Sequence, residues 1–246
     1  DIDTKSYKND AIKRQIPCVV DGLNPARRKI LMGSLMRLQS ESTEIKVFQL
    51  CGAVADSMFY HHGDLSLNGT ITYMAQSFIG ARKFPHLIGV GQFGSRHGDK
   101  AGSARYISVK LSPIIKHIFP QADKYILPYV FEDGKRAEAL YMIPILPMAC
   151  LESYNIVSEG WNHESFGRKL NDVVNIVKDI ILTGEFKQKE MKIDYNGDIR
   201  YYKNYIHSFG YYYYDTKART IVVSELPYGV QTNKFIETLT KSKKND

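Results

Sequence analysis

The sequence predicts an α+β protein, with helices in its first half and mainly strands near its end. Three segments in which apolar residues recur at helical spacing follow one another between residues 24 and 78. Runs of β-branched and aromatic residues then dominate residues 200–226. With 43% hydrophobic and 24% charged residues, the 246-residue chain has the composition of a folded protein and the length for one large domain or two smaller ones.

The first predicted helix begins at Pro25. Asn24 suits the N-cap, because its side-chain oxygen can accept a hydrogen bond from a first-turn N–H, and proline suits the first helical position. Ile30, Leu31 and Leu38 recur at helical spacing and form the buried stripe. Further helices are expected over residues 44–60 and 66–78, and three helices in close succession favour a helix-turn-helix module.

A long glycine-dense loop is expected over residues 89–102. It carries Arg96, His97 and Lys100, and long loops inside a domain usually serve a function. Residues 105–111 follow as a short strand or a loop edge, and residues 113–119 as a helix. The apolar run at residues 143–147 is interrupted by prolines, which is consistent with a domain junction.

Beyond this junction, a helix is expected over residues 172–182 and strands over 200–205, 208–215 and 220–226, with a turn at 215–218. A last helix begins near Asn233 and the chain stops soon after it, so we expect a fragment of a longer protein. The run Tyr211–Tyr214 either stacks on bases or forms a half-buried strand with two tyrosines on each side, and we favour the strand.

Composition excludes several classes of protein. No apolar stretch approaches the roughly 18 residues of a membrane helix, and the first residues do not form a secretory signal. Cys18, Cys51 and Cys150 are odd in number and lack CxxC spacing, which disfavours a disulfide framework or a zinc site and indicates a reducing compartment. The net charge of +7 favours a polyanionic partner.

Arg27, Arg28 and Lys29 fall in the first turn of the first predicted helix. The helix dipole disfavours a cation there by about 0.3–1 kcal/mol. A bound phosphate would offset this cost and use the free N–H groups of the first turn. The alternative is a solvated basic face.

His61 and His62 are adjacent, beside a glycine and an acid. Because adjacent side chains diverge on a helix, we do not expect both to bind one metal ion. One of them can donate to a phosphate or position a water molecule. The alternative is a pair at a helix end that serves as cap and core.

Arg105 and Tyr106 are the sharpest catalytic candidates if the substrate is a phosphodiester. A tyrosine oxygen can attack phosphorus and conserve the bond as a phosphotyrosine, which requires cations nearby. The planar guanidinium of Arg105 suits a non-bridging phosphate oxygen. The chain holds 17 tyrosines, however, and the alternative for any one of them is packing.

Taken together, these motifs resemble the type IIA DNA topoisomerases, specifically eukaryotic-type topoisomerase II. Residues 16–29 resemble the family's IPxVxDGLKPxxRK, and residues 103–107 read SARYI where the family has SPRYI. Collinear with them are residues 48–56, 60–64, 91–96, 143–148, 160–161 and 224–227. The ordered set covers nearly the whole chain and is far more specific than any single motif.

The resemblance implies a winged-helix domain with the catalytic tyrosine at residues 1–145 and the first part of an α/β tower domain at residues 146–246. Tyr106 would cleave DNA and become joined to the 5′ phosphate, while Arg105 would hold the scissile phosphate. Arg28 and His62 would act around the same phosphate. The further DNA-binding residues it implies are Lys29, His61 and Val157. Arg27 in the first helical turn, and Arg96 and Lys100 in the glycine-dense loop, are added to them as basic candidates.

The resemblance also implies Mg²⁺ and ATP as cofactors of the full-length enzyme, bound by domains absent from this chain, and no metal site within it. The isolated chain would bind DNA without cleaving it. Double-stranded DNA and, for the full-length enzyme, a second copy would be the partners, with no membrane. The location would be intracellular: the nucleus for a cellular enzyme, or the host cytoplasm for one from a large cytoplasmic DNA virus.

Some residues depart from the family pattern. Ala104 replaces the proline before the Arg-Tyr pair, and Val157 stands where the family has an isoleucine wedged between bases, which leaves open whether it bends DNA. Such divergence favours a viral or protist source. Two alternatives stay open: a non-catalytic winged-helix DNA-binding or architectural module, and the bacterial gyrase A type, against which the uninterrupted histidine pair argues.

Overall fold

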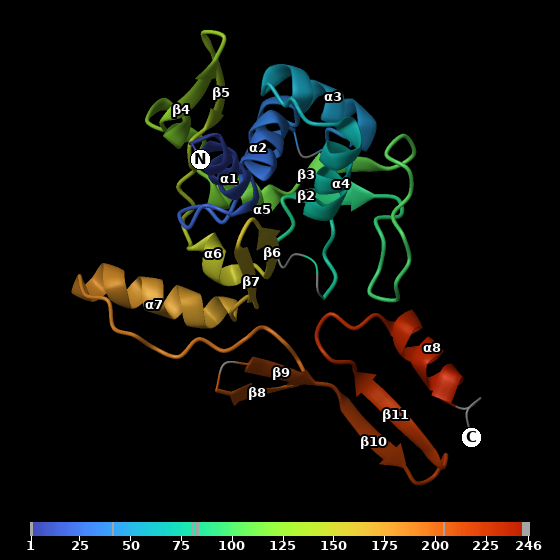
Figure 1. Cartoon of the computed structure of the whole chain (residues 1–246). Helices are drawn as coiled ribbons and strands as arrows, with labels where there is room; N and C mark the ends of the chain where they lie inside the picture. Colours follow the sequence, from blue (N-terminus) through green and yellow to red (C-terminus); the bar gives the residue numbers. More distant parts are fainter. Residues whose placement is uncertain (1, 41, 80, 82–83, 204, 243–246) are drawn as a thin grey trace.

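The chain folds into a helix-rich N-terminal half and a more extended C-terminal half built of hairpins and helices (Figure 1). The computed structural model describes residues 2–40, 42–79, 81, 84–203 and 205–242. The mixture of helices and antiparallel strands confirms the α+β class.

Four helices come first: α1 (Ile2–Gln15), α2 (Pro25–Arg37), α3 (Val47–Ser57) and α4 (Asp64–Met74). Helix α2 begins at the predicted proline, and the side chain of Asn24 accepts the N–H of Arg27 at 3.0 Å. Helix α3 starts later than predicted, because the two residues before it pair as a strand. Helix α1 was not predicted, since its largely exposed residues present no apolar stripe.

A three-stranded antiparallel sheet completes this half, in the order β1 (Ile45–Lys46), β3 (Ser108–Leu111), β2 (Leu87–Val90). Helix α5 (Pro113–Ile118) follows it directly. Three helices with a small antiparallel sheet form the arrangement expected of a winged-helix domain. Because β2 extends to Val90, the glycine-dense loop begins after it, and because β3 starts at Ser108, the Arg105–Tyr106 pair precedes the strand.

One apolar core joins α2, α3, α4 and the sheet. Its fully buried side chains include Ile30, Leu31, Leu50, Val54, Leu67, Ile71, Leu87 and Val109. Met148, Leu151 and Val173, from beyond the proline-rich junction, belong to the same core. The start of the C-terminal half is therefore packed against the helices.

The hairpin of β4 (Tyr129–Glu132) and β5 (Lys135–Ala139) projects beside α1 and α2 and was not predicted (Figure 1). A short 3₁₀ helix, Gln121–Tyr125, precedes it. The two-residue turn between β4 and β5 places Asp133 and Gly134 at φ of 49° and 73°, the backbone conformation that a tight hairpin requires. Asp-Gly between strands was the sequence signal for this element.

The C-terminal half consists of α6 (Met148–Leu151), β6 (Tyr154–Ser158), β7 (Trp161–Ser165), α7 (Leu170–Thr183), β8 (Asp198–Tyr202), β9 (Tyr205–Phe209), β10 (Tyr211–Asp215), β11 (Thr220–Glu225) and α8 (Thr232–Ser242). Its strands pair antiparallel with their chain neighbours. The predicted strand over 208–215 is divided at Gly210 between β9 and β10, and the β6–β7 hairpin was not predicted.

Two local predictions for β10 have different outcomes. The turn after it is confirmed, because the Asp215 carboxylate accepts the N–H groups of Lys217 and Ala218 at 2.9 and 3.0 Å. The half-buried face expected for Tyr211–Tyr214 is not observed, since each of these tyrosines is at least half exposed.

A buried ion pair fixes the segment that leads into α2. Asp21 is fully buried, and its carboxylate accepts four hydrogen bonds: two from the Arg28 guanidinium at 2.7 and 3.1 Å, one from Leu23 N–H at 2.9 Å and one from Met142 N–H at 2.8 Å. The guanidinium also donates to the Leu23 carbonyl at 2.9 Å. One carboxylate thus joins the loop before α2, the helix itself and the chain after β5.

Replacing Asp21 with alanine is expected to destabilise the fold by about 3–5 kcal/mol, because the Arg28 charge remains buried without its partner. Urea unfolding at neutral pH measures this change. Asp198→Ala is the matched control, since it removes an exposed carboxylate paired with Arg200 and is expected to cost well under about 1 kcal/mol. Equal losses in the two variants would contradict the assignment.

Candidate functional site

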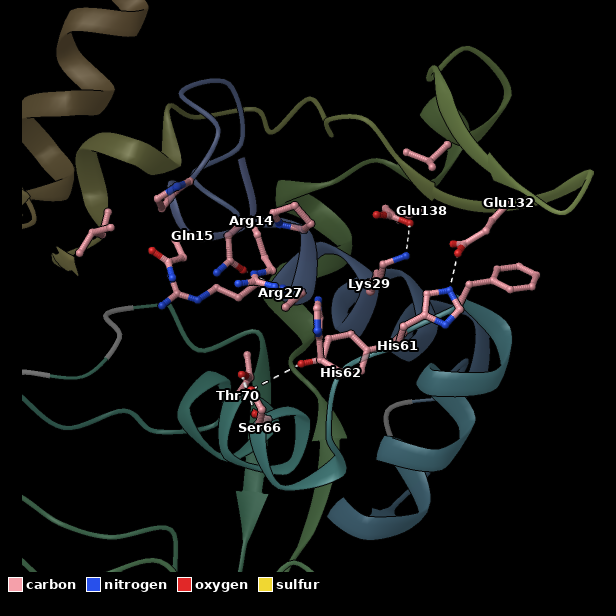
Figure 2. Close-up of a pocket in the computed structure, with 18 of the residues that line it drawn as sticks. Arg14, Gln15, Arg27, Lys29, His61, His62, Ser66, Thr70, Glu132 and Glu138 are labelled. Carbon is pink, nitrogen blue, oxygen red and sulfur yellow. Dashed lines mark hydrogen bonds and ion pairs between the residues drawn. The ribbon is translucent and has the colours of Figure 1, made fainter. Parts of the chain in front are cut away.

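A groove of about 790 Å³ lies where the N-terminus of α2, the α3–α4 junction, the β4–β5 hairpin and β6 meet (Figure 2). It brings together five predicted site residues: Arg27, Lys29, His61, His62 and Val157. Its polar lining also includes Arg14, Gln15, Asn24, Ser66, Thr70, Glu132, Glu138 and Asn155. The groove is therefore lined mainly by hydrogen-bond donors, with two carboxylates on the hairpin side.

The carboxylates of the hairpin hold two of the groove's basic side chains. Lys29 Nζ lies 2.6 Å from the Glu138 carboxylate and 2.5 Å from the carbonyl of Met58, with both side chains largely buried. His61 pairs with Glu132 in a more exposed position (Figure 2). The hairpin thus orients Lys29 and His61 through contacts that are distant in sequence.

Arg27 and His62 rest on aromatic rings instead. The Arg27 guanidinium lies 5.1 Å from the centre of the Tyr73 ring, and the His62 ring packs edge-on against Tyr60 at 5.4 Å. The Tyr60 hydroxyl donates to Ser66 at 3.5 Å, a long contact. Aromatic support keeps the cationic group of Arg27 at the groove surface, where an anion can reach it.

The groove continues along α4 toward Arg105. A second hollow of about 610 Å³ shares Arg27, Ser66 and Thr70 with the groove. A third, of about 770 Å³, shares Leu65, Gly69 and Tyr73 with the second and reaches Arg105. Since α4 has 11 residues, the hollows follow an element about 16 Å long. We call this continuous surface the α4 track.

Tyr106 lies in an exposed turn at the far end of the α4 track. Its side chain is 80% exposed, and its N–H donates to the Ser103 carbonyl at 2.8 Å. The N–H groups of Val47 and Phe48, the first residues of α3, donate to the carbonyls on either side of the Arg-Tyr pair, each at 3.1 Å. The turn is therefore fixed on the positive end of α3, which favours a nearby anion.

Two basic side chains accompany this turn. The Arg105 guanidinium lies over the Phe48 ring at 5.5 Å from its centre. Lys46 Nζ donates to the Tyr106 carbonyl at 3.3 Å. An exposed phenol beside a guanidinium at the positive end of a helix suits a phosphodiester, because the guanidinium and the helix dipole both favour its negative charge.

Three predicted residues lie elsewhere. Arg28 is only 4% exposed and is held by Asp21, so its geometry does not offer it to a phosphate. Arg96 pairs with Glu225, and Lys100 is exposed on the glycine-dense loop. The predicted set is therefore divided among the groove, the tyrosine turn, this loop and, for Arg28, the protein interior.

Val157 reaches the groove from β6. It is 70% exposed and pairs across the hairpin with Asn162, near the turn at Gly160. Its neighbour Asn155 and also Arg14 line the same groove, and neither was predicted from the sequence. Arg14 carried no local signal, because α1 itself had no recognisable pattern.

Metal binding has no support in the ranges that the structure describes. No three His, Cys, Asp or Glu side chains there come close enough to hold an ion. The described carboxylates of the groove are instead paired with Lys29 and His61. Nor is any described helix long and apolar enough to span a membrane.

The sequence profile of the DNA gyrase/topoisomerase IV family, in its A-subunit form, matches residues 14–246. The chain belongs to this family. Among the family's curated members, it is 44% identical over 261 residues to DNA topoisomerase 2 of an African swine fever virus isolate, an alignment that spans 98% of this chain and 22% of the relative. It is 38% identical over 181 residues to DNA topoisomerase 2-alpha of Sus scrofa, spanning 73% of this chain and 12% of that protein.

A solved family structure supports the same assignment. The DNA-binding, cleavage and re-ligation domain of Plasmodium falciparum topoisomerase II superposes with a TM-score of 0.87 at 31% identity, covering 96% of this chain and 33% of that one. The viral and eukaryotic relatives confirm the predicted eukaryotic type. This chain spans about one fifth of the viral relative's length.

Replacing Lys29 with alanine is expected to destabilise the fold by about 3 kcal/mol, because the buried Glu138 carboxylate loses its partner. The double variant Lys29→Met/Glu138→Leu is expected to recover most of that loss, since no buried charge remains. Urea unfolding of the single and double variants tests the pair. Lys110→Ala, which breaks a more exposed pair with Glu44 at 3.8 Å, is the control and should change the free energy of unfolding little. A loss of stability in the double variant equal to the sum of the losses in the two single variants would contradict the coupling of Lys29 and Glu138.

Proposed function

We propose that this chain is the DNA-binding and cleavage part of an ATP-dependent type II topoisomerase. The observation that carries the proposal is the exposed Tyr106 beside Arg105, fixed on the N-terminus of α3 at one end of the α4 track. The named relatives, all topoisomerases, favour this over a non-catalytic architectural module.

In the proposed reaction, the Tyr106 oxygen attacks a backbone phosphorus of duplex DNA. The tyrosine O–P bond forms as the bond from phosphorus to the 3′ oxygen breaks, and the phenolic proton ends on that 3′ oxygen. The product is a phosphotyrosine at the 5′ phosphate and a free 3′ hydroxyl, so the reverse attack reseals the strand without an energy source. Arg105 stabilises the charge that develops on the phosphate oxygens.

The α4 track supports binding of the duplex. Arg27, His62 and the polar face of α4 offer donors to phosphates. Lys29 and His61 lie beside them, each paired with a carboxylate of the β4–β5 hairpin. In this proposal Arg28 acts indirectly, by fixing the loop that leads into α2. Lys100 contacts DNA from the glycine-dense loop.

The complete enzyme, in this proposal, adds the domains that this chain lacks. Residues 1–145 are its winged-helix domain and residues 146–246 the first part of its tower domain, joined through the shared core. Mg²⁺ and ATP bind, in this proposal, to those other domains. The enzyme works as a homodimer on DNA inside cells, in the nucleus or, for a cytoplasmic DNA virus, in the host cytoplasm.

Tyr106→Phe tests the proposal. In the complete enzyme it is expected to keep DNA affinity and to abolish cleavage, because only the attacking oxygen is lost. Arg105→Ala should also lose cleavage, and Arg105→Lys should recover it in part, since lysine restores the charge but not the two-pronged geometry. Protein-linked, end-labelled DNA after denaturation is the measurement.

Tyr125→Phe is the matched control, because Tyr125 is equally exposed on a different surface and should leave cleavage unchanged. The 246-residue chain alone should bind duplex DNA in a salt-dependent manner without cutting it. Supercoil relaxation by the Tyr106→Phe enzyme would refute the role of this tyrosine.

Val157 is proposed to enter a base step and bend the DNA. Val157→Ala should reduce the bend angle and Val157→Ile should preserve or increase it, because the apolar volume inserted changes in that order. Fluorescence energy transfer between labelled duplex ends measures the angle. Three equal angles would show that the side chain is not a wedge.

A further inference from the structure

The tip of the glycine-dense loop is bonded to the point where β11 leads into α8. The Arg96 guanidinium pairs with the Glu225 carboxylate and donates to the Leu226 carbonyl at 3.2 Å. In the other direction, the N–H groups of Thr232 and Asn233 donate to the carbonyls of Arg96 and His97 at 3.3 and 3.0 Å. We call these contacts the loop–α8 junction.

Each side of the junction supplies hydrogen-bond partners or charge to groups on the other side, although the Glu225 carboxylate also accepts the N–H of Leu226 at 3.0 Å. The first N–H groups of a helix lack intrahelical acceptors, and the loop carbonyls supply them for α8. The Glu225 side chain is 9% exposed, so its charge requires the arginine. Removal of either charge therefore affects both sides.

The receiving side is itself held in place. The Tyr195 hydroxyl donates to the Leu226 carbonyl at 2.5 Å and lies 3.2 Å from the Phe209 carbonyl. Burial, together with the nearby Glu225 carboxylate, raises the pKa of Tyr195 and keeps this hydroxyl protonated as a donor. The junction thus joins the loop to an anchored part of the C-terminal half.

A short stem connects the junction to the tyrosine turn. Phe93 and Ala101 form an antiparallel bridge, and Gly102 N–H donates to the Gln92 carbonyl at 2.8 Å. The Gln76 side chain, after α4, donates to the Phe93 carbonyl at 2.7 Å. The second segment of the stem, at Ala101 and Gly102, leads within a few residues into the turn that carries Tyr106.

We propose that Arg96 and Glu225 are positioning residues for DNA cleavage: through the stem, the loop–α8 junction sets the placement of Arg105 and Tyr106. The inference rests on the proposed function. It replaces the expectation that Arg96 binds DNA, because its guanidinium is occupied by Glu225 and a backbone carbonyl. The C-terminal half thereby controls the geometry of the nucleophile.

The two roles for Arg96 predict different effects on DNA binding. If the Arg96 guanidinium bound a phosphate, Arg96→Ala would weaken duplex binding and lower the slope of log K against log salt by about 0.9. A positioning role predicts an unchanged slope and a dissociation constant within about twofold of wild type. It also predicts that Glu225→Ala has the same phenotype, although it removes a charge of the opposite sign.

The test compares Arg96→Ala, Glu225→Ala and the swapped pair Arg96→Glu/Glu225→Arg in the complete enzyme. Both single variants are expected to lower single-turnover cleavage by about ten- to a hundredfold, the cost of a small misplacement of reacting groups. The swapped pair should recover part of the rate, since the ion pair returns without the bond to Leu226. Arg200→Ala, in an exposed pair on β8, is the control and should leave cleavage unchanged.

Amide exchange on the 246-residue chain provides a second readout that needs no catalysis. Both single variants should raise exchange at residues 103–107 and in the first turn of α8 while leaving α2 and α3 protected. Glu225→Gln, which keeps the shape and an acceptor oxygen, replaces Glu225→Ala if α2 and α3 lose protection. Unchanged exchange at residues 103–107 would overturn the proposal, as would a lowered salt slope in Arg96→Ala.

The outcomes separate this proposal from the proposed function. If the wild-type enzyme forms no protein-linked DNA, the function fails and the exchange experiment still decides the coupling. If wild-type cleavage is normal and both single variants cleave at the wild-type rate, the function stands and the positioning role is refuted.

Discussion

The buried carboxylate of Asp21 is the constraint on which the candidate site depends. Its four hydrogen bonds fix the loop before α2, the first turns of that helix and the chain after β5. By occupying Arg28 inside the protein, it sets the rotation of α2 about its axis. Arg27 and Lys29 are then presented to the groove, and Asn24 is placed to cap the helix.

The groove is a product of both halves of the chain. Helices α2 and α4 supply donors, β6 supplies Val157, and the β4–β5 hairpin supplies two carboxylates. Because Glu138 neutralises Lys29 and Glu132 occupies His61, the groove carries less free positive charge than a count of its basic residues suggests. Arg14 and Arg27 contribute charge from the opposite wall.

Local sequence signals predicted the elements whose causes are local. Asn24 and Pro25 set the start of α2, and the Asp215 side chain sets the turn after β10. Helix α1 and the β6–β7 hairpin had no comparable pattern. The sequence predicted Arg105 and Tyr106 as site residues, but only the structure shows that their turn is held by the first N–H groups of α3.

Contacts between distant residues could not be predicted in the same way. Lys29 and Glu138 lie 109 positions apart, and Arg96 and Glu225 lie 129 apart. The sequence around a basic residue does not differ between one whose charge pairs with a carboxylate of the protein and one whose charge binds a phosphate. The partners of Arg28, Lys29 and Arg96 are therefore set by the tertiary fold, and so is the division of the predicted site into separate surfaces.

The consecutive placement of three basic residues at the start of α2, Arg27, Arg28 and Lys29, constrains how this segment can evolve. They point in three directions, because successive side chains on a helix are about 100° apart. Insertion or deletion of one residue between Asp21 and Arg28 would turn a different side chain toward the buried carboxylate. Selection is therefore expected to hold the length of this segment more strictly than the identity of the residues within it.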